Sequence, residues 1–257
     1  MRGLKFYLFA LIFISTSLIT VAQDDKPVNI SLTVSPSVAW LAPGNTGYTS
    51  EGSRIGIKYG LLTDFRLFGV ENYSLTTGFT MNHIGGKLIE PSTFKESSGI
   101  VLAAEDNATY KLTYIDVPFA IRLKTNEIGY NTFYAVFGSE FGFNIAGKKE
   151  FTTKYGNSST GEFTNDVSGD IQLFRSSLVF GAGIERNISG NTSYRIGITY
   201  HNGLTNVLKG NGTEGDKGKA FAVDGNGNTL IENNAPVYDK KLSTKLKFIE
   251  LNLAILF

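Results

Sequence analysis

Phe248–Phe257 reads FIELNLAILF, and a large apolar side chain occupies every second position through Phe257. The positions between them hold Glu250, Asn252 and Ala254. This alternation is typical of a β-strand with two chemically different faces. The termini of soluble domains are usually poorly ordered, so a strand that stays apolar to its last residue needs another explanation. We expect this strand to lie in a bilayer and to close a sheet by pairing with the first strand, which would leave no unpaired edge in lipid.

The same period of two recurs in seven earlier segments of the chain. They are residues 29–41, 53–64, 73–82, 110–124, 133–145, 178–185 and 194–200. One face of each segment carries large apolar side chains, and the other carries mainly glycine, hydroxyl groups and a few charges. Each is about long enough to cross a bilayer as a tilted strand. The pattern predicts an all-β fold, an eight-stranded antiparallel transmembrane β-barrel of the outer-membrane type, apolar outside and polar inside.

The links between the predicted strands alternate in length. Residues 65–72, 125–131 and 187–192 form short links, whereas residues 83–109, 147–171 and 201–242 form long ones. Such alternation is expected when one end of a barrel faces the periplasm and the other the exterior. We expect the three long links to be extracellular loops that contact a protein partner, because loops longer than about 15 residues usually serve binding or are disordered.

Aromatic residues fall at both ends of the predicted strands. Transmembrane barrels place such rings at the two membrane interfaces. The predicted interface aromatics are Tyr73, Phe133, Tyr194 and Phe257 at the periplasmic ends and Trp40, Phe143 and Tyr200 at the external ends.

The N-terminus predicts export. Residues 1–22 contain Arg2 and Lys5, then an apolar stretch and a small residue before Gln23, which is the pattern of a secretory signal peptide. Residues 23–257 would then form the barrel domain, in contact with outer-membrane lipid of a Gram-negative cell. The chain has no cysteine, which excludes disulfides and a lipoprotein anchor, and its formal net charge of +1 gives no reason to expect a nucleic-acid partner.

Three segments resemble a known family. They are YIDVPFAIRLK (Tyr114–Lys124), LVFGAGIE (Leu178–Glu185) and the closing strand FIELNLAILF. In these segments the chain resembles the PorT-like outer-membrane β-barrel family common in Bacteroidetes. The resemblance implies an outer-membrane barrel, and the namesake branch of that family is associated with type IX protein secretion.

Alternation also assigns a set of charged residues to the barrel interior. An eight-stranded barrel is filled by side chains, so charges inside it are expected to pair. We predict a packed charge network that plugs the lumen; the alternative is a gated narrow conduit. The predicted inner charges are Lys58, Arg122, Arg175 and Arg195 with Asp116, Glu140, Glu185 and Glu250.

The two histidines, His83 and His201, are predicted to be ordinary residues at the outer rim. Catalysis by His201 would require a nucleophile and an orienting group, and the surrounding TYHNG offers no neighbouring serine. Two histidines without further ligands at a diagnostic spacing do not make a metal site. We therefore predict no enzymatic activity, no metal site and no cofactor.

Two loop motifs resemble ligand sites in composition, but neither fits the pattern that such a site requires. VDGNGNTLIE (Val223–Glu232) alternates Asp and Asn, but Thr229 stands where a calcium loop needs glycine, so a hairpin is favoured over a calcium site. Residues 210–218 (GNGTEGDKG) lack the strand-to-helix context of a phosphate cradle.

Two functions follow from this sequence. The first is a structural or interaction barrel with a plugged lumen, whose outer loops bind a partner in a secretion or surface assembly. The alternative is a small passive porin-like channel for small solutes.

Overall fold

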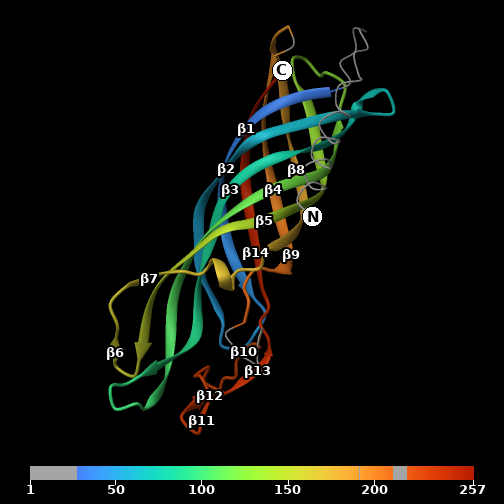
Figure 1. The fold of residues 1–257 in the computed structure, drawn as a ribbon. Coiled ribbons are helices and arrows are strands. Elements are labelled where there is room, and N and C mark those ends of the chain that lie inside the picture. Colours follow the sequence, from blue (N-terminus) through green and yellow to red (C-terminus); the bar gives the residue numbers. More distant parts are fainter. Residues whose placement is uncertain (1–27, 191, 211–218) are drawn as a thin grey trace, which may run out of the picture.

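A computed structural model describes residues 28–190, 192–210 and 219–257 (Figure 1). The predicted signal peptide, and residues 211–218 of the glycine-rich loop, lie outside the described residues. In the described part of the chain, no helix is long and apolar enough to cross a membrane; this finding concerns helices alone.

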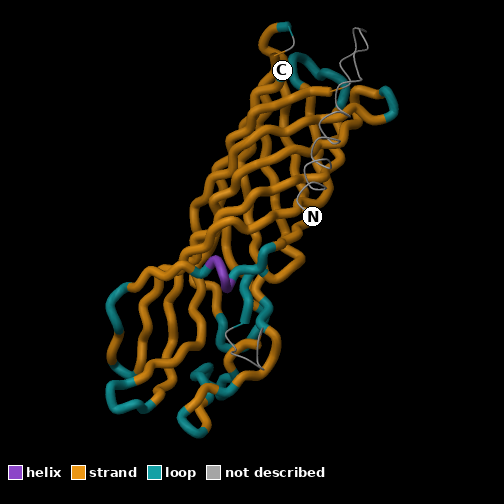
Figure 2. Tube along the Cα trace, in the orientation of Figure 1, coloured by secondary structure: helices purple, strands orange, loops and turns teal. Residues whose placement is uncertain are grey.

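Eight long strands form a closed ring, shown as a lattice of strands in Figure 2. Each strand pairs antiparallel with the next, and the last pairs with the first. The backbone N–H of Phe257 donates to the carbonyl of Ile30 at 2.9 Å, so the end of the chain completes the closure. The predicted eight-stranded antiparallel barrel is confirmed. The ring strands are β1 (Val28–Pro43), β2 (Thr49–Leu67), β3 (Val70–Lys95), β4 (Val101–Lys124), β5 (Thr132–Tyr155), β8 (Phe174–Ser189), β9 (Thr192–Asn206) and β14 (Thr244–Leu256).

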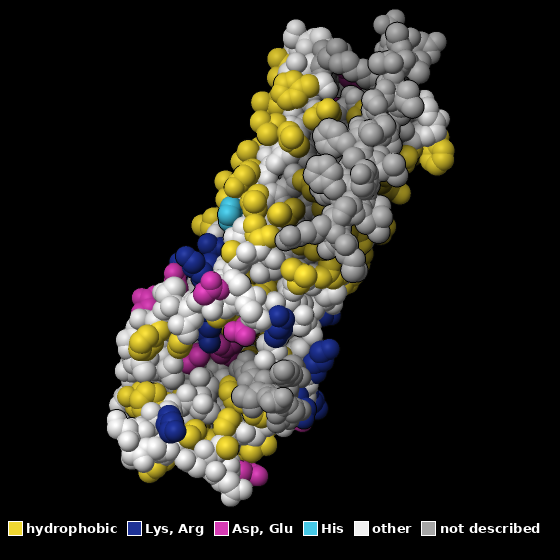
Figure 3. All heavy atoms as spheres, in the orientation of Figure 1, with side chains coloured by type: hydrophobic (Ala, Val, Ile, Leu, Met, Phe, Trp, Pro, Cys, Tyr) yellow, Lys and Arg dark blue, Asp and Glu magenta, His cyan; other side chains and the backbone are white. Residues whose placement is uncertain are grey.

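The outward face of the barrel is apolar and the inward face is polar. On β1, Ile30 and Leu32 are about half exposed, whereas Ser31 and Thr33 are buried. Figure 3 shows the resulting belt of hydrophobic side chains over the barrel. This distribution is the inverse of that in a soluble protein and suits a lipid environment.

Glycines on the inward face make room for large polar side chains. A Cβ atom on Gly142 would lie 2.5 Å from Asp116 Oδ1 and 2.7 Å from Arg175 Nε. A Cβ on Gly197 would lie 2.2 Å from the hydroxyl of Tyr134. The interior is close-packed at these points, which explains why small residues recur there.

Two of the three predicted long loops are mostly strand, and the prediction of loops was wrong there. β3 continues to Lys95 and β4 begins at Val101, so residues 83–109 form an extended hairpin. β5 continues to Tyr155. Figure 1 shows these strands leaving the barrel as a sheet at the end opposite the chain's C-terminus. We call this end the outer end and the opposite one the inner end.

Short elements complete the sheet at the outer end. Two strands that follow β5 pair back onto it, and a short 3-10 turn then leads toward β8. These elements are β6 (Ser158–Ser159), β7 (Phe163–Asp166) and η1 (Ser168–Asp170).

The described part of the third long link folds into short hairpins. β10 pairs with β13, and β11 pairs with β12. The side chain of Asn234 accepts a hydrogen bond from the N–H of Val101 at 2.7 Å and donates one to the carbonyl of Gly99 at 3.0 Å, so this link lies against the tip of the β3–β4 hairpin. The short strands are β10 (Lys219–Phe221), β11 (Ile231–Glu232), β12 (Ala235–Pro236) and β13 (Tyr238–Lys241).

The predicted hairpin at Val223–Glu232 is confirmed. Val223 bridges Thr229, and the carboxylate of Asp224 accepts hydrogen bonds from the backbone N–H groups of Asn226 and Asn228. The aspartate therefore closes the turn itself. In the described ranges, no group of three or more His, Cys, Asp or Glu residues could hold a metal ion.

Beyond the bilayer-facing belt, the interior of the outer end becomes apolar. Buried hydrophobic side chains from several strands meet there in one cluster. We call its largest fully buried members the apolar cap: Leu41, Ile84, Leu88, Leu112, Tyr114, Ile171, Leu246 and Phe248.

Candidate functional site

Two clusters of ion pairs lie inside the barrel. The cluster nearer the outer end draws one side chain from each of six strands, and all six are at most 5% exposed. Its members, the outer ion cluster, are Lys58, Asp116, Glu140, Arg175, His201 and Glu250.

Glu140 lies at the centre of the outer ion cluster. Its carboxylate accepts hydrogen bonds from Lys58 Nζ at 2.8 Å and from Arg175 Nη2 at 3.1 Å. Lys58 also contacts Glu250 at 2.9 Å, and Arg175 also contacts Asp116 at 2.6 Å. Each cation therefore bridges two carboxylates, which compensates much of the cost of burying the charges.

His201 belongs to this cluster, and the prediction that it is a rim residue was wrong. The side chain is 1% exposed, with Nδ1 3.3 Å from Glu140 and Nε2 3.1 Å from Glu250. β9 continues to Asn206, past the predicted end of that strand, which carries residue 201 into the interior. His83 faces outward, 3.3 Å from the hydroxyl of Tyr59 and 3.2 Å from that of Thr113.

The second cluster lies nearer the inner end. Asp64 accepts hydrogen bonds from both Arg122 and Arg195, the latter at 2.8 Å. Glu185 forms ion pairs with Arg195, whose Nη2 lies 2.7 Å from Oε2, and with Lys124, whose Nζ lies 2.9 Å from Oε1. The members of this inner ion cluster are Asp64, Arg122, Lys124, Glu185 and Arg195.

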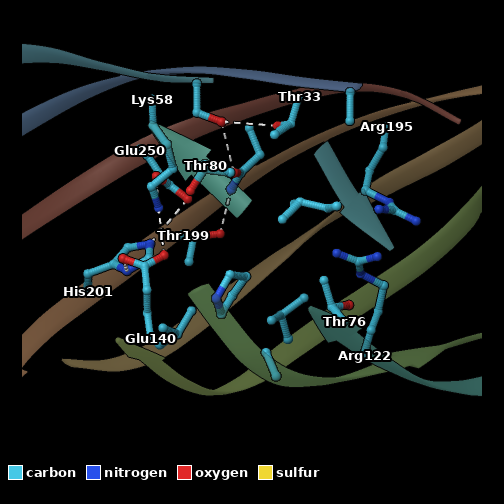
Figure 4. Close-up of a pocket in the computed structure, with 18 of the residues that line it drawn as sticks. Thr33, Lys58, Thr76, Thr80, Arg122, Glu140, Arg195, Thr199, His201 and Glu250 are labelled. Atoms are coloured by element: carbon cyan, nitrogen blue, oxygen red, sulfur yellow. Dashed lines mark hydrogen bonds and ion pairs between the residues drawn. The ribbon is translucent and has the colours of Figure 1, made fainter. Parts of the chain in front are cut away.

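An aromatic ring supports the two arginines of the inner ion cluster. The guanidinium carbons of Arg122 and Arg195 lie 5.2 and 5.5 Å from the ring centroid of Tyr134. Figure 4 shows the two guanidinium groups turned toward one another on one side of the pocket. The acceptor Asp64 and the Tyr134 ring together offset the repulsion between the two positive charges.

The space between the two ion clusters is small. A cavity of about 60 Å³ lies there, lined by both clusters and by the hydroxyl groups of Thr33, Thr76, Thr80 and Thr199 (Figure 4). Such a volume holds only a few water molecules. The arrangement can hold charges in fixed positions, but it offers little room for a solute.

All eight predicted inner charges lie on the inward face, divided between the two clusters. Sequence reasoning missed Asp64, Lys124 and His201. Asp64 and Lys58 are an even number of positions apart on β2 and so lie on the same, inward face; alternation could therefore have identified Asp64. Lys124 is the last residue of β4, where alternation is a weaker guide.

The predicted interface aromatics lie on the outer surface of the barrel. Tyr73, Phe133, Phe143 and Phe257 are exposed, while Trp40, Tyr194 and Tyr200 are partly exposed. The rings of Trp40 and Tyr200 stack with centroids 6.4 Å apart across β14.

A second, larger cavity lies at the outer end beyond the apolar cap. It has a volume of about 380 Å³ and is lined by residues of β3, β4 and β5 and by Phe221 of β10. Lys149 bridges Glu90 and Asp106 there, and the hydroxyl of Tyr110 donates to Glu90. Burial raises the pKa of Glu90, with a contribution from the neighbouring charge of Asp106, while Lys149 opposes the shift.

Comparison with known proteins places the fold in a family. Residues 21–208 match the family described as outer membrane protein beta-barrel domain. The chain belongs to this family. The outer membrane is therefore its location, and lipid surrounds the apolar belt. The matched range ends before β14, the strand that closes the ring.

Among solved structures, several bacterial barrels are similar. Neisserial surface protein A shares 10% identity over 90% of this chain and 96% of that chain, with a TM-score of 0.42. Ail, the attachment invasion locus protein of Yersinia pestis, shares 13% identity over 90% and 100% of the two chains, with a TM-score of 0.37. The outer membrane protease OmpT from Escherichia coli shares 9% identity over 94% and 99%, with a TM-score of 0.35. No curated protein matches the sequence.

Proposed function

We propose that this protein is a closed outer-membrane barrel of the structural or interaction type, which holds its outer elements at the cell surface for contact with a partner. The observation that carries the proposal is the filling of the lumen. Two ion clusters and the apolar cap follow one another along the barrel axis, and the cavity between the clusters is about 60 Å³.

The order of these layers favours a plug over a conduit. A cavity of about 330 Å³ opens at the inner end, lined by Asp64, Lys124 and Glu185 of the inner ion cluster. The outer cavity of about 380 Å³ lies beyond the apolar cap. A hydrated ion travelling between them would have to break ion pairs and then cross the apolar cap, where the hydroxyl of Tyr114 is the one polar side-chain group among the cap residues that could replace its water. The alternative function, a small passive channel, requires both barriers to open.

The outer elements supply the surface for a partner. Residues 83–109 and 147–171 form the outer sheet, and residues 201–210 and 219–242 provide part of β9 and the hairpins beside it. Ile100, in the turn between β3 and β4, and Phe163, on the edge strand β7, are about half exposed. The rings of Phe94 and Tyr155 stack 3.9 Å apart. Exposed apolar and aromatic side chains on a rigid sheet suit a protein partner.

The remaining features of the proposal concern export and context. The N-terminal 22 residues are proposed to act as a signal peptide that directs residues 23–257 to the outer membrane of a Gram-negative cell. The resemblance to the PorT-like family of Bacteroidetes motivates a role in a secretion assembly. No reaction is assigned to the chain, and the ion clusters are given a structural role.

Crosslinking in intact cells tests the partner proposal. A photoreactive residue is placed at Phe163 or Ile100, and the matched control is placed at Tyr130, which is 75% exposed in the β4–β5 link at the inner end. We expect a reproducible protein adduct from the outer sites that the inner site does not give. Capture of secretion components would support the secretion role. The same adducts from all three sites, or none from the outer sites, would contradict a dedicated outer surface.

A further inference from the structure

A group of basic side chains lies on the outward face of the barrel, at the border between the apolar belt and the outer sheet. It comes from four consecutive strands of the ring. Figure 3 shows Lys and Arg side chains gathered along this border. We call the group the basic patch; its members are Arg54 on β2, Lys87 on β3, Lys111 on β4 and Lys148 on β5.

The basic patch begins where the lipid-facing residues end. On β5, Phe143 and Ile145 are 44% and 50% exposed, and Lys148 follows three residues after Ile145. Three residues of strand span about 10 Å. The neighbouring strands carry the Tyr59–His83 contact at the same border. This height corresponds to the headgroup region of the outer leaflet.

The pairing of the strands brings positive charges close together. Lys111 lies directly opposite Lys148 in the β4–β5 pair. Lys87 lies two positions from Gly85, the β3 residue opposite Lys111, and is therefore a diagonal neighbour of Lys111. Like charges in these positions repel each other unless an anion lies between them.

Acidic neighbours compensate only part of this charge. Glu150 forms an ion pair with Lys111, and Asp166 lies opposite Lys148 in the β5–β7 pair. Four cations and two carboxylates leave a formal charge of +2 on this surface. The side chain of Lys111 is 41% exposed, and Lys87 and Lys148 are exposed, so an anion can reach them.

The arginine of the patch is held along the sheet surface. A Cβ on Gly85 would lie 3.4 Å from Arg54 Cδ, so the stem of the arginine, which comes from β2, lies against this glycine of β3. Guanidinium groups suit phosphate because they can donate two parallel hydrogen bonds to it.

We propose that the basic patch binds the phosphate of an anionic lipid in the outer leaflet, with the acyl chains lying along the apolar belt below it. Each basic residue near a charged membrane surface contributes a similar increment of attraction, so the affinity for an anionic lipid depends on the number of cations in the patch. Continuity of the patch with the belt distinguishes a lipid site from a site for a free anion, because only a lipid contacts both.

The test measures lipid binding by the purified full-length barrel. The protein is held in phosphatidylcholine–detergent micelles and titrated with phosphatidylglycerol, and the bound lipid is counted by native mass spectrometry. The double variant Lys111→Gln/Lys148→Gln is compared with Lys95→Gln/Lys154→Gln, which removes two exposed lysines near the far tip of the same sheet. We expect about 30-fold weaker binding in the first variant, equivalent to about 2 kcal/mol. The second variant should bind like the unmodified protein.

Three results would overturn the proposal. One is equal retention of phosphatidylglycerol by the patch variant and the control. Another is no preference for phosphatidylglycerol over phosphatidylcholine in the unmodified protein. The third is displacement of the lipid by an equal concentration of inorganic phosphate, which would indicate a site for free anions. If the Lys111→Gln/Lys148→Gln variant fails to fold, Lys87→Gln/Lys148→Gln replaces it, because it also removes two positive charges from the basic patch. The same lipid-binding comparison with the control is then made.

Discussion

The ring of His201 lies flat against the ring of Phe248, with centroids 4.0 Å apart and planes inclined by 10°. His201 contacts the carboxylates of Glu140 and Glu250, whereas Phe248 belongs to the apolar cap. This stacked pair is the point at which the charged interior of the barrel meets its apolar closure. The two layers therefore support each other, and damage to either should weaken the whole outer half of the lumen.

Glu140→Ala should strongly destabilise the barrel. The substitution leaves Lys58 and Arg175 with one carboxylate partner each in a buried environment, a change that costs about 3–5 kcal/mol. Unfolding by urea in lipid vesicles measures the loss. Glu71→Ala is the matched control, since that carboxylate is 75% exposed in its pair with Arg66 and should cost about 1 kcal/mol or less. Equal losses in the two variants would contradict the account.

Phe248→Ala should destabilise the barrel by about 3–5 kcal/mol, because it removes a fully buried ring from the apolar cap and leaves a cavity. Leu253→Ala lies on the same strand but faces lipid at 40% exposure, and lipid can fill the space that it leaves. The same urea experiment should therefore show a clearly smaller loss for Leu253→Ala. The reverse order would show that the cap is not packed as described.

Gly142→Ala should destabilise the barrel by about 1–3 kcal/mol through overpacking, because the new methyl group meets the Asp116–Arg175 ion pair. Gly161→Ala serves as the control, since a Cβ there meets nothing within 4 Å. Thermal unfolding of the two variants side by side measures the difference. A Gly142→Ala variant as stable as the control would mean that the ion pair can move aside.

The outer end should lose stability as pH rises through the titration range of Glu90. Burial raises the pKa of this carboxyl, so the folded protein binds the proton more tightly than the unfolded chain. Stability is then full below the ordinary carboxyl pKa of about 4.3 and declines as the pH passes the raised value. Hydrogen exchange of the β3–β4 hairpin measures this decline. Glu90→Gln should flatten the profile, and Glu105→Gln, an exposed carboxyl on β4, should not. Protection of the hairpin that increases with pH over this window would contradict a raised pKa of Glu90.

Alternation predicted the lipid-facing part of the barrel because each strand there has one apolar and one polar face. The outer sheet escaped prediction because the two faces exchange character along β3, and because a register shift between Asn144 and Ala146 interrupts the alternation on β5. On β3, the inward side chains change from Thr80 and Asn82 to Ile84 and Leu88, while outward Lys87 is exposed. A reading that expects the same face to stay apolar throughout therefore ends the strand too early at this point.

The charge network was partly predictable for a similar reason. Parity identified Lys58 and Glu140 as inward residues, and it could equally have identified Asp64. It could not supply the partners of each charge, because the ion pairs join strands far apart in the sequence. His201 was assigned to the rim because the predicted strand ended at Tyr200, and only the continuation of β9 shows that the ring enters the interior.

Single-channel recording in planar bilayers tests the closed lumen most directly. The purified full-length barrel is inserted alone, and the Glu140→Ala variant is recorded beside it. We predict no stable conductance steps from either protein, because the apolar cap remains when one carboxylate of the outer ion cluster is lost. Reproducible steps from the unmodified barrel, increasing in number with the amount of protein inserted, would contradict the plug and favour the passive channel.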